Sequence, residues 1–190
     1  MWPAIINVMD SAARKAARSL QHDFGEVEQL QVSRKGPADF VSEADRRAEQ
    51  IIKAELSKAR PGFSMLLEEE GAVGSKDAAD RWIVDPLDGT TNFLHGIPHF
   101  AISIAHEQNG ELIAGMVYDP TRDETFWAVK GAGCFLGNTR LRVSARDSLD
   151  IAVLATGIPF GNRPGKEEMR AALVPVMDRT AGLRRFGAAS

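Results

Sequence analysis

Apolar side chains recur at helical spacing along two stretches near the start of the chain. Within residues 4–24 they lie three or four positions apart, with Pro3 at the first turn, and this spacing predicts a helix. The same spacing returns after Ser42, which is followed three residues later by an acid, as at many helix starts. We expect this second helix to run to about Ala59, because a Pro-Gly pair follows it.

Beyond the second helix the pattern changes to that of strands. Residues 63–67 read as a strand that leads into three consecutive acids, and residues 82–84 read as a short buried strand. The Asn109-Gly110 pair separates two further strand-like runs, which is typical of a hairpin with a two-residue turn. Further strands are predicted at 101–106, 111–118, 125–129, 151–156 and 182–186, and a helix at 166–179.

Composition narrows the class of protein. A chain of 190 residues that is 44% hydrophobic and 26% charged is typical of an ordinary globular protein, and we expect one domain over residues 1–190. A formal net charge of -3 argues against direct binding to nucleic acid. The single cysteine, Cys134, excludes an intramolecular disulfide and fits a reducing compartment. Without a stretch of signal-peptide type or a long apolar run, we expect a cytoplasmic protein that does not bind membranes.

Two carboxylates follow the strand predicted at residues 82–84. Asp85 and Asp88 are separated by Pro86, which fixes φ and stiffens the turn that carries Asp88 back toward Asp85. Both carboxylates could then share hard cations. The Gly-Thr-Thr run at 89–91 would offer backbone N–H groups to a phosphate if a helix starts there. An Asx-type turn with a helix cap would need no ligand, but it explains only one of the two acids.

Other acidic positions have a simpler explanation beside the functional one. Three acids in a row, Glu68-Glu69-Glu70, would ordinarily form a solvated loop. They follow a buried strand just as Asp85 does, so neighbouring strands could present these carboxylates at one edge of a sheet. Asp45 lies in the first turn of the second predicted helix, where a carboxylate complements the positive end of the helix dipole. Capping is therefore its simpler role, and a role in the site is the alternative.

Carboxylates without cysteine or histidine beside them favour a magnesium site. Phosphate monoesters hydrolyse so slowly in water that a catalyst must lower the barrier by on the order of 20 kcal/mol. Two divalent ions about 3.5–4 Å apart can activate water on one side of the phosphorus and stabilise the leaving oxygen on the other. Mg²⁺ prefers oxygen ligands, so we expect Asp85 to bridge two ions, Glu68 to complete the first and Asp88 to join the second.

A second set of groups would orient the nucleophilic water. Glu69 or Glu68 would hold it, together with Thr90 and Asp45. A hydroxyl such as that of Thr90 relays a proton only if a carboxylate can take that proton, which gives Asp45 a purpose beyond capping.

These residues resemble the motifs of the inositol monophosphatase family. Residues 82–93 are similar to the family's central motif, and residues 39–45, the Glu68-Glu69 pair and residues 187–189 match its other motifs in the same order. The resemblance implies an α/β (α+β) fold with layers in the order αβαβα. It also implies two or three Mg²⁺ ions, sensitivity to Li⁺ and a homodimer. The family pattern continues past residue 190 with a Trp-Asp motif that supplies a further metal ligand, so we expect the fold to be truncated after about two thirds.

The resemblance also implies a role for each matching residue. The metal positions are Glu68, Asp85, the backbone carbonyl of Leu87, and Asp88. The catalytic positions that activate the water are Asp45 and Thr90, to which the chemistry above adds Glu69. The substrate-binding positions are Asp88, Gly89, Thr90, Thr91, Gly187 and Ala189.

The expected function is Mg²⁺-dependent hydrolysis of a small phosphorylated polyol or sugar. Inositol 1-phosphate, cleaved to inositol and phosphate, is the leading substrate. Alternatives within the same fold are a fructose-1,6-bisphosphatase and an adenosine 3′,5′-bisphosphate phosphatase. A further alternative is a non-catalytic relative that binds another protein, because some bacterial members of the family are implicated in regulation linked to RNA polymerase.

Overall fold

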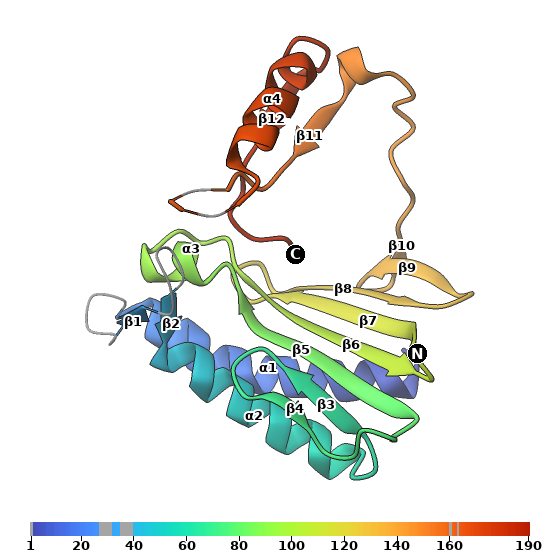
Figure 1. Ribbon diagram of the computed structural model, residues 1–190. Coiled ribbons are helices and arrows are strands. Elements are labelled where there is room, and N and C mark those ends of the chain that lie inside the picture. The colour runs from blue at the N-terminus through green and yellow to red at the C-terminus, as the bar shows by residue number, and fades with distance from the viewer. Residues whose placement is uncertain (1, 27–31, 35–39, 160, 163) are drawn as a thin grey trace.

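The computed structural model describes all residues except 1, 27–31, 35–39, 160 and 163 (Figure 1). For residues 32–34 and 40–42 it describes the backbone alone. Of the predicted motif at 39–45, Asp39 therefore lies outside the described residues, and so does the side chain of Ser42. Within the described residues, no helix is both long enough and apolar enough to span a lipid bilayer.

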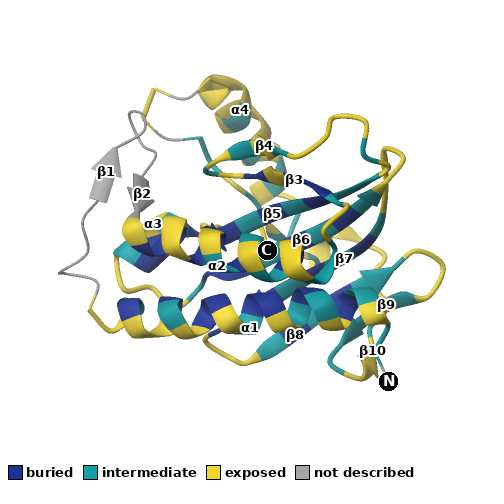
Figure 2. Ribbon diagram, turned by 90° about the horizontal axis from the view of Figure 1, so that it is seen from below, coloured by how far each residue is buried: buried dark blue, intermediate teal, exposed yellow. Residues whose placement is uncertain are grey.

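Two helices pack side by side and cover one face of a large sheet (Figure 1). They are α1 (Ala4–Phe24) and α2 (Glu43–Ala59), as the apolar spacing predicts. Buried positions alternate with exposed ones along both helices (Figure 2). On α1 the buried stripe is rich in alanine, including Ala12 and Ala16, and such small side chains let a neighbouring helix approach closely. A short antiparallel pair, β1 (Val32–Arg34) and β2 (Phe40–Ser42), connects the two helices.

Among the described residues, eight strands form the large sheet, in the order β10, β9, β8, β7, β6, β5, β3, β4. These strands are β3 (Ser64–Leu67), β4 (Gly71–Val73), β5 (Asp80–Asp88), β6 (Ala101–Gln108), β7 (Glu111–Asp119), β8 (Glu124–Val129), β9 (Gly133–Leu136) and β10 (Thr139–Arg140). β3 and β5 run parallel, and the other neighbours run antiparallel. The predicted hairpin is confirmed between β6 and β7, where Asn109 and Gly110 have φ values of 51° and 81°.

The core lies between the two helices and the sheet. Alternate side chains of the central strands, such as Trp82, Ile104 and Met116, are buried beside the apolar stripes of α1 and α2. This alternation follows from the two-residue period of a strand, which turns successive side chains to opposite faces. The packing of helices on a mixed sheet confirms the predicted α/β (α+β) class.

The prediction of a strand that ends at Asp85, with Asp88 carried on a turn, is wrong. β5 continues to Asp88, which pairs with Ala101 of β6, and the register shifts between Asp85 and Asp88. Pro86 has no N–H to donate to a neighbouring strand, so it is accommodated where the ladder is irregular. Both acids are therefore held by the sheet rather than by a free turn. The short helix α3 (Thr90–Leu94) begins directly after Gly89, which is the condition set for the phosphate cradle.

The last part of the chain lies on the side of the sheet opposite α1 and α2 (Figure 1). It contains the 3-10 helix η2 (Leu149–Ile151), the parallel strands β11 (Val153–Ala155) and β12 (Gly182–Arg184), and the helix α4 (Lys166–Met177). No residue of α4, which is described throughout, is buried. After β12 the chain returns to the large sheet, and its last residues contact the end of β5.

Candidate functional site

The parallel pairing of β3 and β5 brings two of the predicted metal ligands together. Leu67 pairs with Val84, so the next residues along the two strands, Glu68 and Asp85, follow paired positions. The pKa of Asp85 is raised to about 7, first by burial, then by the negative charge of Glu68, and then by that of Asp88. Carboxylates that repel one another in a partly buried place need a cation to compensate them. This pair therefore fits a hard divalent ion.

Asp88 is turned toward the end of the chain. Its Oδ2 accepts hydrogen bonds from the backbone N–H groups of Ala189 and Ser190 and from the Ser190 hydroxyl, each at 2.6 Å. Within the part of the chain that the structure describes, no three His, Cys, Asp or Glu side chains converge closely enough to hold a metal ion. Asp88, the third predicted carboxylate, thus contributes its charge to the site, while its Oδ2 is hydrogen-bonded to Ala189 and Ser190.

The backbone around Leu87 links the carboxylates to the start of α3. The Leu87 N–H donates to Asp85 Oδ1 at 3.1 Å, which fixes the side chain of that acid. The Leu87 carbonyl, a predicted metal ligand, accepts a hydrogen bond from the Thr90 hydroxyl at 3.0 Å. The atoms here that could ligate a metal, the Asp85 carboxylate and the Leu87 carbonyl, are oxygen atoms, the ligand type that Mg²⁺ prefers over softer ligands.

The structure also brings together the predicted proton-transfer pair. Asp45 is 2% exposed and lies in the first turn of α2, and its Oδ2 is 3.4 Å from Thr90 Oγ1. The hydroxyl has a single proton and two neighbouring acceptors, Asp45 and the Leu87 carbonyl. Asp45 can therefore complement the helix dipole and accept from Thr90 with the same carboxylate.

The turn between β3 and β4 carries Glu68, Glu69 and Glu70. Its backbone is held by a residue that the sequence analysis missed: the Glu69 and Glu70 N–H groups donate to the two carboxylate oxygens of Glu49, at 2.8 and 3.1 Å. Glu49 is 1% exposed, and burial raises the pKa of its carboxyl group. An acid beside the apolar stripe of α2, next to the buried Ala48, was the available signal.

The predicted phosphate cradle lies where two loops meet closely. Gly89 has a φ of 94°, and a Cβ atom there would lie 3.0 Å from the His99 carbonyl and 3.1 Å from the Ala188 Cβ, so only glycine fits without a shift. Thr90 and Thr91 form the first turn of α3, where backbone N–H groups lack carbonyl partners within the helix.

A hollow of about 630 Å³ opens beside Asp88. Its walls come from Asp88 and from the segments around β11, α4 and β12; among the lining residues are Ile158, Met169, Arg185, Gly187 and Ala189. Two predicted substrate contacts, Gly187 and Ala189, therefore share a cavity with Asp88. Gly187 also packs tightly on Asn92, whose side chain donates to the Phe186 carbonyl at 2.8 Å.

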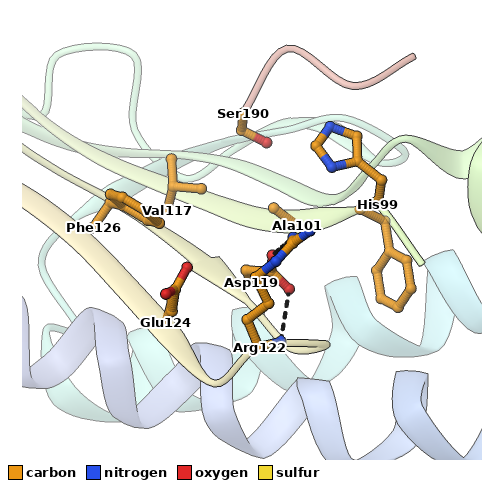
Figure 3. A pocket seen from close by; sticks show the side chains of 9 residues that line it. His99, Ala101, Val117, Asp119, Arg122, Glu124, Phe126 and Ser190 are labelled. Carbon is orange, nitrogen blue, oxygen red and sulfur yellow. Dashed lines mark hydrogen bonds and ion pairs between the residues drawn. The ribbon is translucent and has the colours of Figure 1, made fainter. Parts of the chain in front are cut away.

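A second hollow, of about 350 Å³, lies beyond Ser190 on the sheet (Figure 3). Its walls include Val117 and Phe126, and its one arginine, Arg122, pairs with Asp119 at 2.6 Å. Neither Asp85 nor Asp88 lines this hollow. Its link to them is Ser190, whose hydroxyl donates a hydrogen bond to Asp88. The candidate site is therefore the Asp85 end of β5 and the larger hollow.

The comparison with protein families settles the relationship. A model of the inositol monophosphatase family matches residues 3–190. The chain belongs to the inositol monophosphatase family. The predicted resemblance is thereby confirmed.

Relatives of this inositol monophosphatase family member bear two kinds of name. This chain is 54% identical over 187 residues to the inositol-1-monophosphatase of Mesorhizobium japonicum. The alignment covers 98% of this chain and 70% of that protein. The chain is 45% identical over 193 residues to the Nus factor SuhB of Pseudomonas aeruginosa, in an alignment that covers 98% of this chain and 70% of that protein.

A solved structure shows the same fold. The extragenic suppressor protein SuhB from Bartonella henselae superposes with a TM-score of 0.94 at 55% identity, over 98% of this chain and 72% of that one. The family fold that the motifs imply is thus confirmed over the matched part of the chain.

Proposed function

We propose that this protein hydrolyses a small phosphate monoester with the help of Mg²⁺, and that inositol 1-phosphate is its substrate. The observation that carries the proposal is the Glu68 and Asp85 pair, whose mutual repulsion in a partly buried place calls for a cation. The 54% identity to an inositol-1-monophosphatase supports the choice of reaction and substrate.

Four groups would hold two or three Mg²⁺ ions: Glu68, Asp85, the Leu87 carbonyl and Asp88. When bound, the ions would supply an activated water and would offset the charge that develops on the phosphate. Asp88 would join them with the same carboxylate whose Oδ2 accepts hydrogen bonds from Ala189 and Ser190. Asp88 thereby connects the metal site to the hollow beside it.

The remaining residues would handle the proton and the substrate. Thr90 would hold the attacking water and pass its proton to Asp45, and Glu69 would help to orient that water. The N–H groups of Gly89, Thr90 and Thr91 would bind the phosphate oxygens. Gly187 and Ala189 would contact the ring hydroxyls together with Asp88, since all three line the same hollow.

The test is phosphate release from inositol 1-phosphate with Mg²⁺ alone and with Mg²⁺ plus Li⁺. We expect turnover that lithium inhibits, and we expect Asp88→Asn to abolish it. Undiminished rates in that variant would overturn the assignment. Fructose 1,6-bisphosphate and adenosine 3′,5′-bisphosphate, assayed beside it, distinguish the two bisphosphatase alternatives. Homodimer formation, also implied by the family, stays a prediction for sedimentation analysis.

A second candidate is a regulatory role without turnover, favoured by the 45% identity to a Nus factor. Calorimetry with Mg²⁺ separates the two. A scaffold with a degenerate site binds Mg²⁺ weakly and releases no phosphate, whereas the enzyme binds it and turns over.

A further inference from the structure

The acidic turn between β3 and β4 is held from α2 by a buried carboxylate. Glu49 uses both of its oxygens, one for the N–H of Glu69 and one for the N–H of Glu70. Two hydrogen bonds from consecutive residues to one carboxylate fix the orientation of the backbone as well as its position. The residue just before this pair is Glu68, the proposed metal ligand.

The anchor itself cannot move easily. Glu49 is 1% exposed, and Ala48 and Ile52 of the same helix are buried too. It would therefore cost free energy for the carboxylate to give up these hydrogen bonds without reaching water. Asp45 precedes it by four positions, so the two acids lie on the same side of the helix. The same helix therefore contacts two parts of the site: Asp45 contacts Thr90, and Glu49 contacts the acidic turn.

We propose that Glu49 is a positioning residue: it holds the β3 to β4 turn so that Glu68 lies against Asp85, and it thereby sets the affinity of the site for Mg²⁺. The inference rests on the proposed function for the identity of the ion. It goes beyond that function because Glu49 is not among the groups proposed to hold the metal or the substrate; its oxygens bind the backbone of the turn.

A second link to the same turn provides a matched control. Lys53, one turn further along α2, contacts the Glu70 carboxylate at 2.6 Å. This ion pair involves the side chain of Glu70 and not its backbone, and that side chain is 38% exposed, so the pair contributes little to the position of the turn's backbone. Lys53→Met removes it without touching the contacts of Glu49.

The test compares Glu49→Gln, Glu49→Asp and Lys53→Met in the full chain. Glutamine keeps one acceptor and places an NH₂ group against a backbone N–H, so one hydrogen bond is lost and two donors face each other. Calorimetry with Mg²⁺ should show about 10- to 100-fold weaker binding for Glu49→Gln, the usual effect of losing a group that orients a metal ligand. Lys53→Met should bind within about twofold of wild type.

The conservative variant and the kinetics separate positioning from general damage. Glu49→Asp keeps the carboxylate on a shorter arm and should recover part of the affinity. In the phosphate assay, Glu49→Gln should raise the Mg²⁺ concentration for half-maximal rate while kcat at saturating Mg²⁺ stays near wild type. A fall in kcat with unchanged Mg²⁺ dependence, or equal Mg²⁺ affinity in wild type and Glu49→Gln, would overturn the proposal.

A measurement on the unmodified protein covers the case in which the variants do not fold. Amide hydrogen exchange should show the Glu69 and Glu70 N–H groups protected although they lie in a turn, and rapid exchange would overturn the inference. If wild type binds Mg²⁺ without releasing phosphate, the proposed function fails while the affinity comparison still decides the role of Glu49. If wild type binds no Mg²⁺, both fail.

Discussion

At the scale of single residues, Asp85 is the centre of the candidate site. Burial raises its pKa to about 7, together with the negative charges of Glu68 and Asp88. A carboxylate in that position destabilises the metal-free protein when it ionises and stabilises the metal-bound one. The same side chain should therefore have opposite effects on metal-free stability and on activity.

Asp85→Asn tests this opposition. Asparagine can still accept the hydrogen bond from the Leu87 N–H, so the backbone turn should persist. The rate of phosphate release should fall by more than about a hundredfold. Even the loss of a residue that only orients a metal ligand typically lowers metal affinity or activity about 10- to 100-fold. In EDTA the variant should melt no lower than wild type, because the repulsion with Glu68 is gone. A lower melting temperature in EDTA would contradict the electrostatic account.

Thr90 is the residue that we propose to pass the proton of the attacking water to Asp45. Thr90→Ala should lower kcat by roughly 100-fold or more, within the range for losing a proton-transfer partner, and should leave Mg²⁺ affinity nearly unchanged. Thr90→Ser keeps the hydroxyl near Asp45 and should restore most of the rate. Steady-state phosphate release, read beside Mg²⁺ calorimetry, checks both variants. Weak metal binding in Thr90→Ala would mean that its hydrogen bond to the Leu87 carbonyl matters more than proton transfer.

At the scale of elements, the sheet rests on turns whose backbone conformations are fixed by local sequence. Gly110 in the β6 to β7 hairpin has a φ of 81°. Among the described residues other than Gly110 and its two chain neighbours, no heavy atom lies within 4 Å of the place that a Cβ would take. The position thus tests backbone strain without steric clash. For residues other than glycine, a left-handed backbone conformation costs about 1–2 kcal/mol of free energy.

Gly110→Ala should lower the free energy of unfolding by about 1 kcal/mol. Gly62→Ala is the matched control, because Gly62 also has open space around it but no positive φ. It should change stability by no more than about 0.5 kcal/mol. Urea denaturation of the three proteins gives both values. Equal losses in both variants would show that strain at the hairpin is not the cause.

At the scale of the whole molecule, the site draws on elements from distant parts of the chain. β3, β5, α2, α3 and the last residues after β12 all contribute to it. A ligand that binds this assembled site and not the unfolded chain must stabilise the entire fold.

Mg²⁺ should therefore raise the melting temperature. At a free concentration of 100 times Kd the stabilisation is about 2.7 kcal/mol, which corresponds to roughly 5–10 °C for a chain of this size. Differential scanning calorimetry with Mg²⁺ and with EDTA measures the shift. Asp85→Asn, with the central ligand removed, should show little of it. An equal shift in that variant would place the bound ion elsewhere.

The sequence by itself determined the local elements and the family, and it indicated the chemistry that we propose for the site. Helical spacing defined α1 and α2 to within a residue, and the Asn109-Gly110 pair defined the hairpin, because both depend on periodicity and backbone preference over short distances. The acids around Asp85 indicated a metal site, and the order of the motifs indicated the family, which the comparison confirmed.

Only the tertiary structure decided how these acids are held. Pro86 suggested a turn after Asp85, but pairing with β6 carries β5 on to Asp88, and such pairing depends on residues distant in sequence. Asp88 accepts hydrogen bonds from Ala189 and Ser190, and Glu49 accepts them from the backbone of the acidic turn. Every residue except proline has a backbone N–H group. The residue types therefore do not show which of these groups a distant carboxylate binds.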